Sequence, residues 1–337
     1  MDWKDQLKGL WKRAIWTRAA DFTLPGVLFE IQPDFVIVGR LTGRTNGDGQ
    51  GQFGRLVLAP LEQEALAASP SGPAILNKPA LGKVLEKMAL AAGNGQARVG
   101  ALVPDGVARV GVFSFETLPA NSREAATLIG WRMRENLPFA PEEARISYQT
   151  TLAGERSGGS QIDVAAVAIR SSVAMEFEEI FEGINRSTAL ILPATVALLA
   201  LLPQEEASGQ LLVHVCANAA TLAVVEGQRL RFWRTRDLTG LAPEEIFAQT
   251  AAEVARVVAS TEDRLKLRLD RMWLCARPPA TESWAEELAQ ALGRDVELLQ
   301  PVPETGGLLS GDDRLFYRRY GAPLAGLVAN GALEKNQ

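Results

Sequence analysis

Cysteine and histidine are scarce in this chain of 337 residues, and their spacing excludes several kinds of site. The two cysteines, Cys216 and Cys275, lie in separate apolar stretches and do not form the CxxC spacing of a redox or zinc motif. The single histidine, His214, lies inside an apolar stretch with no HExxH motif. We therefore expect two buried thiols, a structural histidine, no metal site and no catalytic residues.

Long hydrophobic runs are also absent. The longest apolar stretch, residues 189–202, is shorter than the roughly 20 residues of a membrane helix and contains Pro193, which favours a core segment. The first twenty residues lack the uninterrupted apolar region of a signal peptide. These absences, together with the unpaired cysteines, predict a cytoplasmic location.

Excess positive charge is missing as well. The net charge is −5 with both signs interspersed, so nucleic acid is not an expected partner. A hydrophobic content of 47% over this length is enough for a large core and about two domains. The composition predicts an ordinary globular protein.

The first 21 residues have the pattern of an amphipathic helix. Trp3, Leu7 and Trp11 recur at helical spacing, with Lys4 and Lys8 largely on the opposite side. We expect this helix to dock on the protein itself or on a partner. Peripheral contact with an anionic membrane surface is the alternative.

Two β-hairpins are predicted, at residues 27–41 and 212–233, where apolar β-formers flank a short break. They look like two copies of the unit that the actin, sugar kinase and Hsp70 superfold uses twice, with Asp-X-Gly at the turn for approach to phosphate. The first turn instead has Glu30 and Gln32, and the second has His214 and Cys216. Pro33 donates no N–H and acidic side chains repel phosphate, so neither turn is a good phosphate cradle.

Helical patterns alternate with strands along the rest of the chain. Residues 79–92, 121–136, 172–183, 243–261, 282–292 and 315–333 are predicted helices, the last interrupted at Pro323. Apolar strands are expected at residues 97–103, 107–115, 148–152, 162–170, 272–276 and 296–299. The order predicts an α/β protein with two related halves.

Residues 131–148, WRMRENLPFAPEEARISY, carry a family resemblance. The segment is similar to the Trp-x-x-x-x-x-Ile-Pro-Phe-x-x-Glu-Glu-x-x-x-x-Tyr stretch of the PilM family of type IV pilus assembly proteins. Residues 288–301, LAQALGRDVELLQP, resemble a second stretch of that family. Leu118-Pro119 before a helix and the returning strand at residues 162–170 also match, and the order and spacing of all these matches together make the resemblance fairly specific.

The resemblance implies a duplicated actin-like ATPase fold, with ribonuclease H-like halves, related to the cell-division protein FtsA. Its expected parts are the helix at 1–21, a first half at 22–190 with a small subdomain inserted at about 104–160, a second half at 191–317, and a C-terminal helix at 318–337 that returns to the first half. It also implies a cytoplasmic scaffold that works with other pilus assembly proteins. The partner would be a PilN-like inner-membrane protein, whose N-terminal tail binds between the first subdomain and the inserted one.

The expected tail-binding residues lie in the resembling segment. Trp131, Leu137 and Phe139 are apolar enough to line a peptide groove, and Arg132 and Arg134 are suited to acidic or carbonyl groups. The alternative is that Trp131 and Phe139 are ordinary core residues.

The departures from the family fall on the cleft where its members bind ATP. The Gly-Gly of the adenosine side is replaced by Ala276 and Arg277, which adds to the altered residues of the two turns. Loss of metal-orienting acids and of backbone approach at these sites predicts a pseudo-ATPase without ATP or Mg²⁺. Two alternatives stay open. One is an actin-fold ATPase or kinase that uses Glu30 or Asp34 for metal, and the other is an FtsA-like or type II secretion membrane adaptor.

Overall fold

The computed structural model describes residues 23–45, 51–62, 64–93, 97–153, 161–203, 209–227, 229–277, 281–330 and 332–333. The helix predicted at residues 1–21 lies outside the described residues. Among the helices that are described, none has both the length and the apolar character needed to cross a membrane.

Two five-stranded sheets share one topology, which confirms both predicted hairpins. The first has the order β4-β3-β2-β5-β9 and the second the order β12-β11-β10-β13-β14. In each, an antiparallel three-stranded meander is followed by two strands parallel to its first strand. The first sheet contains β2 (Val27–Ile31), β3 (Phe35–Thr45), β4 (Gly51–Pro60), β5 (Arg98–Val103) and β9 (Ser187–Pro193). The second contains β10 (Gly209–Cys216), β11 (Ala219–Glu226), β12 (Arg229–Asp237), β13 (Leu269–Ala276) and β14 (Val296–Leu298).

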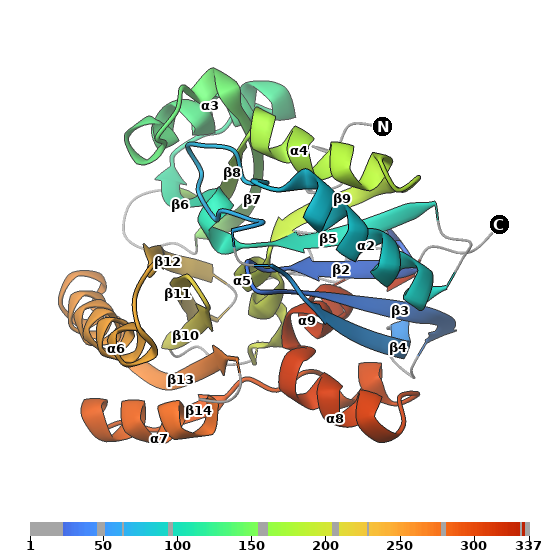
Figure 1. Ribbon diagram of the computed structural model, residues 1–337. Coiled ribbons are helices and arrows are strands. Elements are labelled where there is room, and N and C mark those ends of the chain that lie inside the picture. The colour runs from blue at the N-terminus through green and yellow to red at the C-terminus, as the bar shows by residue number, and fades with distance from the viewer. Residues whose placement is uncertain are drawn as a thin grey trace.

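A smaller sheet with the order β6-β8-β7 interrupts the first half and stands above the rest of the molecule (Figure 1). It consists of β6 (Ala108–Phe115), β7 (Ala144–Ala153) and β8 (Gln161–Arg170). Helix α3 (Ser122–Met133) covers one face, and Asn121 caps the helix by accepting from two backbone N–H groups of its first turn. Ile129 and Met133 of α3 pack on Ile146 and Val164 in a separate small core. This sheet runs on to Arg170, beyond the residue 160 expected for the inserted subdomain.

Longer helices cover the two large sheets (Figure 1). They are α2 (Lys78–Ala92) and α4 (Ser171–Glu182) in the first half, and α6 (Pro243–Ser260) and α7 (Thr281–Leu292) in the second. The short α5 (Ala194–Leu198) directly follows β9.

The C-terminal segment is two helices, α8 (Gly311–Tyr320) and α9 (Ala322–Asn330), where one interrupted helix was predicted at residues 315–333. Pro323 lies in the first turn of α9, where its missing N–H costs no helical hydrogen bond. Helix α9 packs on α5 and contacts β2, and Leu324 and Leu327 are fully buried in the large core. The short β15 (Ala332–Leu333) then pairs with β1 (Thr23–Leu24). The end of the chain thus returns to the first half.

Gly326 determines how closely α9 approaches α5. A Cβ added there would lie 2.2 Å from the carbonyl oxygen of Ala197, a backbone atom that cannot move aside alone. Gly82 in α2 is a matched case with free space, because an added Cβ would have no neighbour within 4 Å.

We predict opposite effects of glycine-to-alanine substitution at these two helical positions. Gly326→Ala should lower the free energy of unfolding by about 1–3 kcal/mol through overpacking. Gly82→Ala should raise it by about 0.5–1 kcal/mol, since alanine has the higher helix propensity. Urea denaturation followed by circular dichroism measures both. A stabilised Gly326→Ala variant would contradict the close approach of the helices.

Candidate functional site

Glu30 and Gln32, at the turn of the first hairpin, are fully buried although both are polar. The Gln32 side-chain amide donates to Oε1 of Glu30 at 3.2 Å, and the Gln32 backbone N–H donates to the carbonyl of Phe35 at 2.9 Å. These hydrogen bonds occupy groups that a phosphate-binding turn would present to its ligand. Asp34, further along the turn, is exposed.

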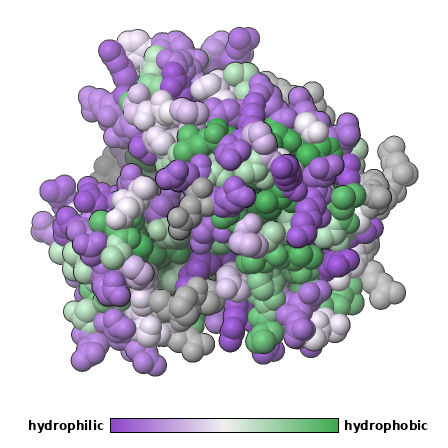
Figure 2. Space-filling model, viewed as in Figure 1, coloured by the Kyte–Doolittle hydropathy of each residue, from purple (hydrophilic) through white to green (hydrophobic). Residues whose placement is uncertain are grey.

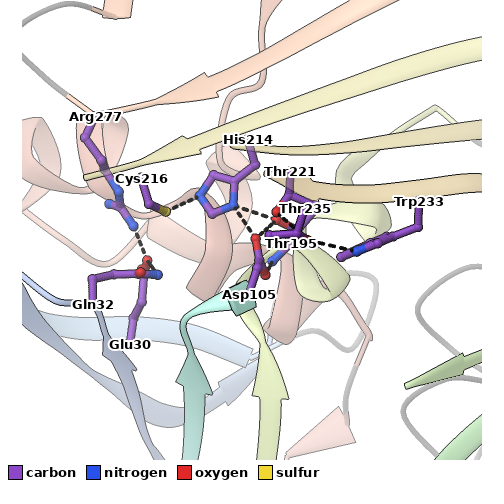
Figure 3. A network of polar contacts seen from close by, with 10 residues as sticks. All are labelled: Glu30, Gln32, Asp105, Thr195, His214, Cys216, Thr221, Trp233, Thr235 and Arg277. Atoms are coloured by element: carbon purple, nitrogen blue, oxygen red, sulfur yellow. Dashed lines mark hydrogen bonds and ion pairs between the residues drawn. The ribbon is translucent and has the colours of Figure 1, made fainter. Parts of the chain in front are cut away.

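Arg277 reaches Glu30 from the second half of the chain, directly after β13 (Figure 3). Its Nη2 donates to Oε1 of Glu30 and its Nη1 donates to the carbonyl of Tyr320 at 3.1 Å. Burial alone would lower the pKa of Arg277, but the negative charge of Glu30, the two nearby cysteines and the hydrogen bond to Glu30 together outweigh burial and hold that pKa above its ordinary value. The ion pair joins the two halves of the molecule.

Two aromatic rings flank the guanidinium of Arg277. Its Cζ lies 4.6 Å from the ring centroid of Phe35 and 5.7 Å from that of Tyr320. Tyr320 is held in turn by stacking on Phe316, at 4.6 Å between ring centroids. Both flanking rings are within the range in which a cation is attracted to a π-face.

A second polar cluster also crosses between the halves, around His214 of β10 (Figure 3). Asp105 begins the short 3-10 helix η2 (Asp105–Val107), and Thr195 lies in α5. Asp105 accepts from the Thr195 backbone N–H at 2.9 Å and from the Thr195 hydroxyl. The Nδ1 atom of His214 lies 2.6 Å from the Thr195 hydroxyl and 3.3 Å from the Asp105 carboxylate. All three side chains are buried.

The hydrogen bonds fix the charge state of Asp105. Burial would raise the pKa of this carboxyl, but hydrogen bonds from His214 and Thr195 outweigh burial and lower the pKa below its ordinary value of 3.8. Asp105 is therefore ionised at neutral pH inside the protein.

This cluster does not have the arrangement of a catalytic triad. In a triad, the carboxylate and the nucleophilic hydroxyl contact opposite nitrogens of the imidazole ring, so that one nitrogen takes the hydroxyl proton while the carboxylate orients the ring and stabilises its positive charge. Here Asp105 and Thr195 both face Nδ1, and Nε2 lies 3.3 Å from the sulfur of Cys216. The geometry supports a structural histidine.

Both cysteines are free and buried, as expected from the sequence. Burial raises the pKa of the Cys216 thiol well above its ordinary value and that of Cys275 to about 12. Neither thiol forms the thiolate that nucleophilic chemistry needs at neutral pH. Within the described ranges, no group of three or more His, Cys, Asp or Glu side chains is placed to hold a metal ion.

The residues expected to bind a partner lie at a surface pocket of about 540 Å³ on the inserted subdomain. Trp131, Arg134, Leu137 and Phe139 line it together with residues 138 and 140–142, whereas Arg132 is exposed outside the lining. Trp131 is 63% exposed, so it is not a core residue. Phe139 is half-buried against the small core and Leu137 is part of it. Figure 2 shows hydrophobic residues at the surface where this subdomain meets the first half.

Sequence reasoning missed four residues between the halves, namely Asp105, Thr195, Phe35 and Tyr320. Asp105 and Thr195 each lie one residue beyond the residue that follows β5 and β9, and neighbouring parallel strands end at the same edge of a sheet, so a signal for these two residues was present. Phe35 and Tyr320 come together from distant segments, and no local pattern marks them. Ala276 is buried at the end of β13 opposite Val215, while the two prolines after Arg277 lie outside the described residues.

Comparison with known proteins identifies the fold. No family model matches the chain, and no curated protein matches its sequence. A solved PilM–PilN type IV pilus biogenesis complex has a similar structure, with a TM-score of 0.77 and 16% identity over 92% of this chain and 99% of the other. A Bacteroides thetaiotaomicron protein with an actin-like ATPase fold and unknown function has a TM-score of 0.50 and 12% identity over 81% of this chain and 89% of the other. The predicted duplicated actin-like fold is confirmed.

We predict that Asp105 stabilises the protein in a pH-dependent way. Because its pKa is lowered in the folded state, its contribution is complete above the unfolded pKa of 3.8 and is lost as the pH falls through the folded value. Asp105→Asn should cost about 1–3 kcal/mol at pH 7, since the amide cannot accept all three donors. The difference from the wild type should shrink below about pH 4.

Denaturation at pH 7 and pH 3 tests this prediction. Asp270→Asn is the matched control, because Asp270 pairs at 2.9 Å with Arg268, whose side chain is 86% exposed. The control should stay within about 0.5 kcal/mol of the wild type. An equal loss for Asp105→Asn at both pH values would contradict the lowered pKa.

Proposed function

We propose that this chain is a scaffold of a type IV pilus assembly system that binds the N-terminal tail of a PilN-like inner-membrane protein without hydrolysing ATP. The observation that carries the proposal is the exposed Trp131 at the pocket of the inserted subdomain. The structural likeness to a PilM–PilN complex supports it. A scaffold of this kind is cytoplasmic and associates with the inner membrane through its partners.

The pocket has the chemistry of a peptide anchor site. Trp131, Leu137 and Phe139 provide apolar contact area, and Arg134 provides guanidinium donors at its edge. Tryptophan and arginine are the residue types that most often dominate binding energy at interfaces. An extended tail with one apolar side chain next to an acidic or carbonyl group matches this set.

The residues of the cleft argue against nucleotide binding. A phosphate group that approached Glu30 would have to draw Arg277 away from it, which would leave a fully buried carboxylate facing another anion. Removing one partner from a buried ion pair costs about 3–5 kcal/mol before any repulsion is counted. Pro33 offers no N–H to a phosphate at the same turn. We therefore place the function at the pocket and not at the cleft.

We predict that Trp131→Ala weakens tail binding without unfolding the protein. Loss of a central tryptophan contact should cost about 2 kcal/mol or more of binding free energy. The probe is a fluorescent peptide with the sequence of the N-terminal tail of a PilN-like inner-membrane protein, titrated in an anisotropy assay. Leu90→Ala is the control, since Leu90 on α2 is also exposed, at 60%, and lies outside the pocket. Equal affinity of both variants would contradict the proposed site.

We also predict that Mg-ATP does not stabilise the protein. A nucleotide at a hundred times its dissociation constant adds about 2.7 kcal/mol to the free energy of unfolding. Denaturation with and without about 5 mM Mg-ATP would thus detect binding in the tens of micromolar range. We expect no shift beyond the error of the measurement. A shift of that size would favour an actin-fold ATPase or kinase over a scaffold.

Peripheral membrane contact through residues 1–21 stays a prediction. Sedimentation with anionic liposomes, with and without these residues, separates it from tail binding. Loss of sedimentation after deletion, with unchanged tail affinity, would favour an additional membrane adaptor role.

A further inference from the structure

The surroundings of Arg277 are those of a bound guanidinium ligand. Glu30 supplies a carboxylate, Phe35 and Tyr320 supply ring faces, and the Tyr320 carbonyl accepts a hydrogen bond at 3.1 Å. We infer that Glu30, Phe35 and Tyr320 form a guanidinium-binding cage in the cleft, and that Arg277 of the second half occupies this cage and thereby holds the halves together.

The cage selects a planar cation, not simply a positive charge. Both rings lie within 6 Å of Cζ, and the two terminal nitrogens of Arg277 use two different acceptors. A planar guanidinium can lie against aromatic rings and donate from two terminal nitrogens to two fixed acceptors, whereas an ammonium is a compact point charge without that geometry. Arg271, on the strand that precedes Arg277, shows the contrast, because it has a ring contact of 5.8 Å to Trp273 and no place in the cage.

Arg277 leaves part of the hydrogen-bonding capacity of the cage unused. Oε2 of Glu30 and Nε of Arg277 are buried and have no hydrogen-bond partner among the described residues. The tether to β13 therefore keeps Arg277 from the two-bond geometry that guanidinium and carboxylate prefer. A free guanidinium without that tether can rotate to contact both carboxylate oxygens. We accordingly expect the emptied cage to bind methylguanidinium.

The two thiols report whether the cleft is closed. The chain has two cysteines, and both are buried close enough to Arg277 for its charge to act on their pKa values. Figure 3 shows Cys216 between Arg277 and His214. Opening of the halves at the cage should expose Cys216 to a thiol reagent.

The experiment measures the labelling rate of Cys216 in the full chain with a chromogenic disulfide reagent, and peptide mass spectrometry assigns the modified cysteine. Arg277→Ala should be labelled at least about ten times faster than the wild type, because its cage is empty. About 10 mM methylguanidinium should restore slow labelling in this variant and leave the wild-type rate unchanged. Arg271→Ala is the matched control and should behave like the wild type.

Glu30→Gln tests the cage by removing the charge of its carboxylate. This variant keeps the shape of the side chain, so it serves as the test if Arg277→Ala does not fold. It should also be labelled faster, and methylguanidinium should not slow it, because the carboxylate is gone. Wild-type labelling rates in a folded Arg277→Ala or Glu30→Gln variant would overturn the inference. So would failure of methylguanidinium to slow labelling in folded Arg277→Ala.

The inference goes beyond the proposed function and does not depend on tail binding. The labelling assay contains neither partner peptide nor nucleotide. Labelling results that contradict the cage would therefore not affect the proposed binding at Trp131. A tail titration that shows no binding would not affect the cage.

Discussion

A fully buried carboxylate needs a counter-charge, and in this protein the counter-charge comes from the opposite half of the molecule. Glu30 belongs to the first sheet and Arg277 follows a strand of the second, so the arginine satisfies Glu30 only while the halves stay close. Leaving either charge buried and unpaired costs several kcal/mol. The relative position of the halves is thus coupled to one ion pair, and the rings of Phe35 and Tyr320 lie beside its guanidinium.

The second polar cluster also satisfies buried polar groups across the boundary between the halves, mainly through hydrogen bonds. Asp105, Thr195 and His214 satisfy one another across the boundary between the halves, and Cys216 fills the remaining nitrogen of the ring. Polar groups that bind a ligand ordinarily form some of their hydrogen bonds with that ligand. The side chains of this cluster instead form hydrogen bonds with one another. These polar groups are therefore part of the protein's own packing. Exposed apolar area lies instead at the pocket on the inserted subdomain.

Local pattern was sufficient for most of the fold and for little of the cleft. The hairpins at Glu30 and His214 and the helix capped by Asn121 follow from alternation, turn residues and capping, which act over a few positions. The altered residues Glu30 and Arg277 were visible singly, but their pairing spans 247 positions and depends on how the two sheets face each other. Trp131 shows a further limit, because helical spacing does not distinguish a core tryptophan from one exposed at a pocket.

The inserted subdomain, which carries the pocket at Trp131, contacts both halves of the molecule and so connects that pocket to the ion pair between the halves. Ion pairs tie this subdomain to the first half, since Arg145 lies 2.5 Å from Glu178 of α4. A further pair ties it to the second half, where Arg231 of β12 lies 3.6 Å from Asp163 of β8. A change in the angle between the halves would strain one of these two attachments. Because Arg277 holds the two halves together, it also holds the subdomain that carries the pocket, which is the arrangement that the proposed binding without nucleotide requires.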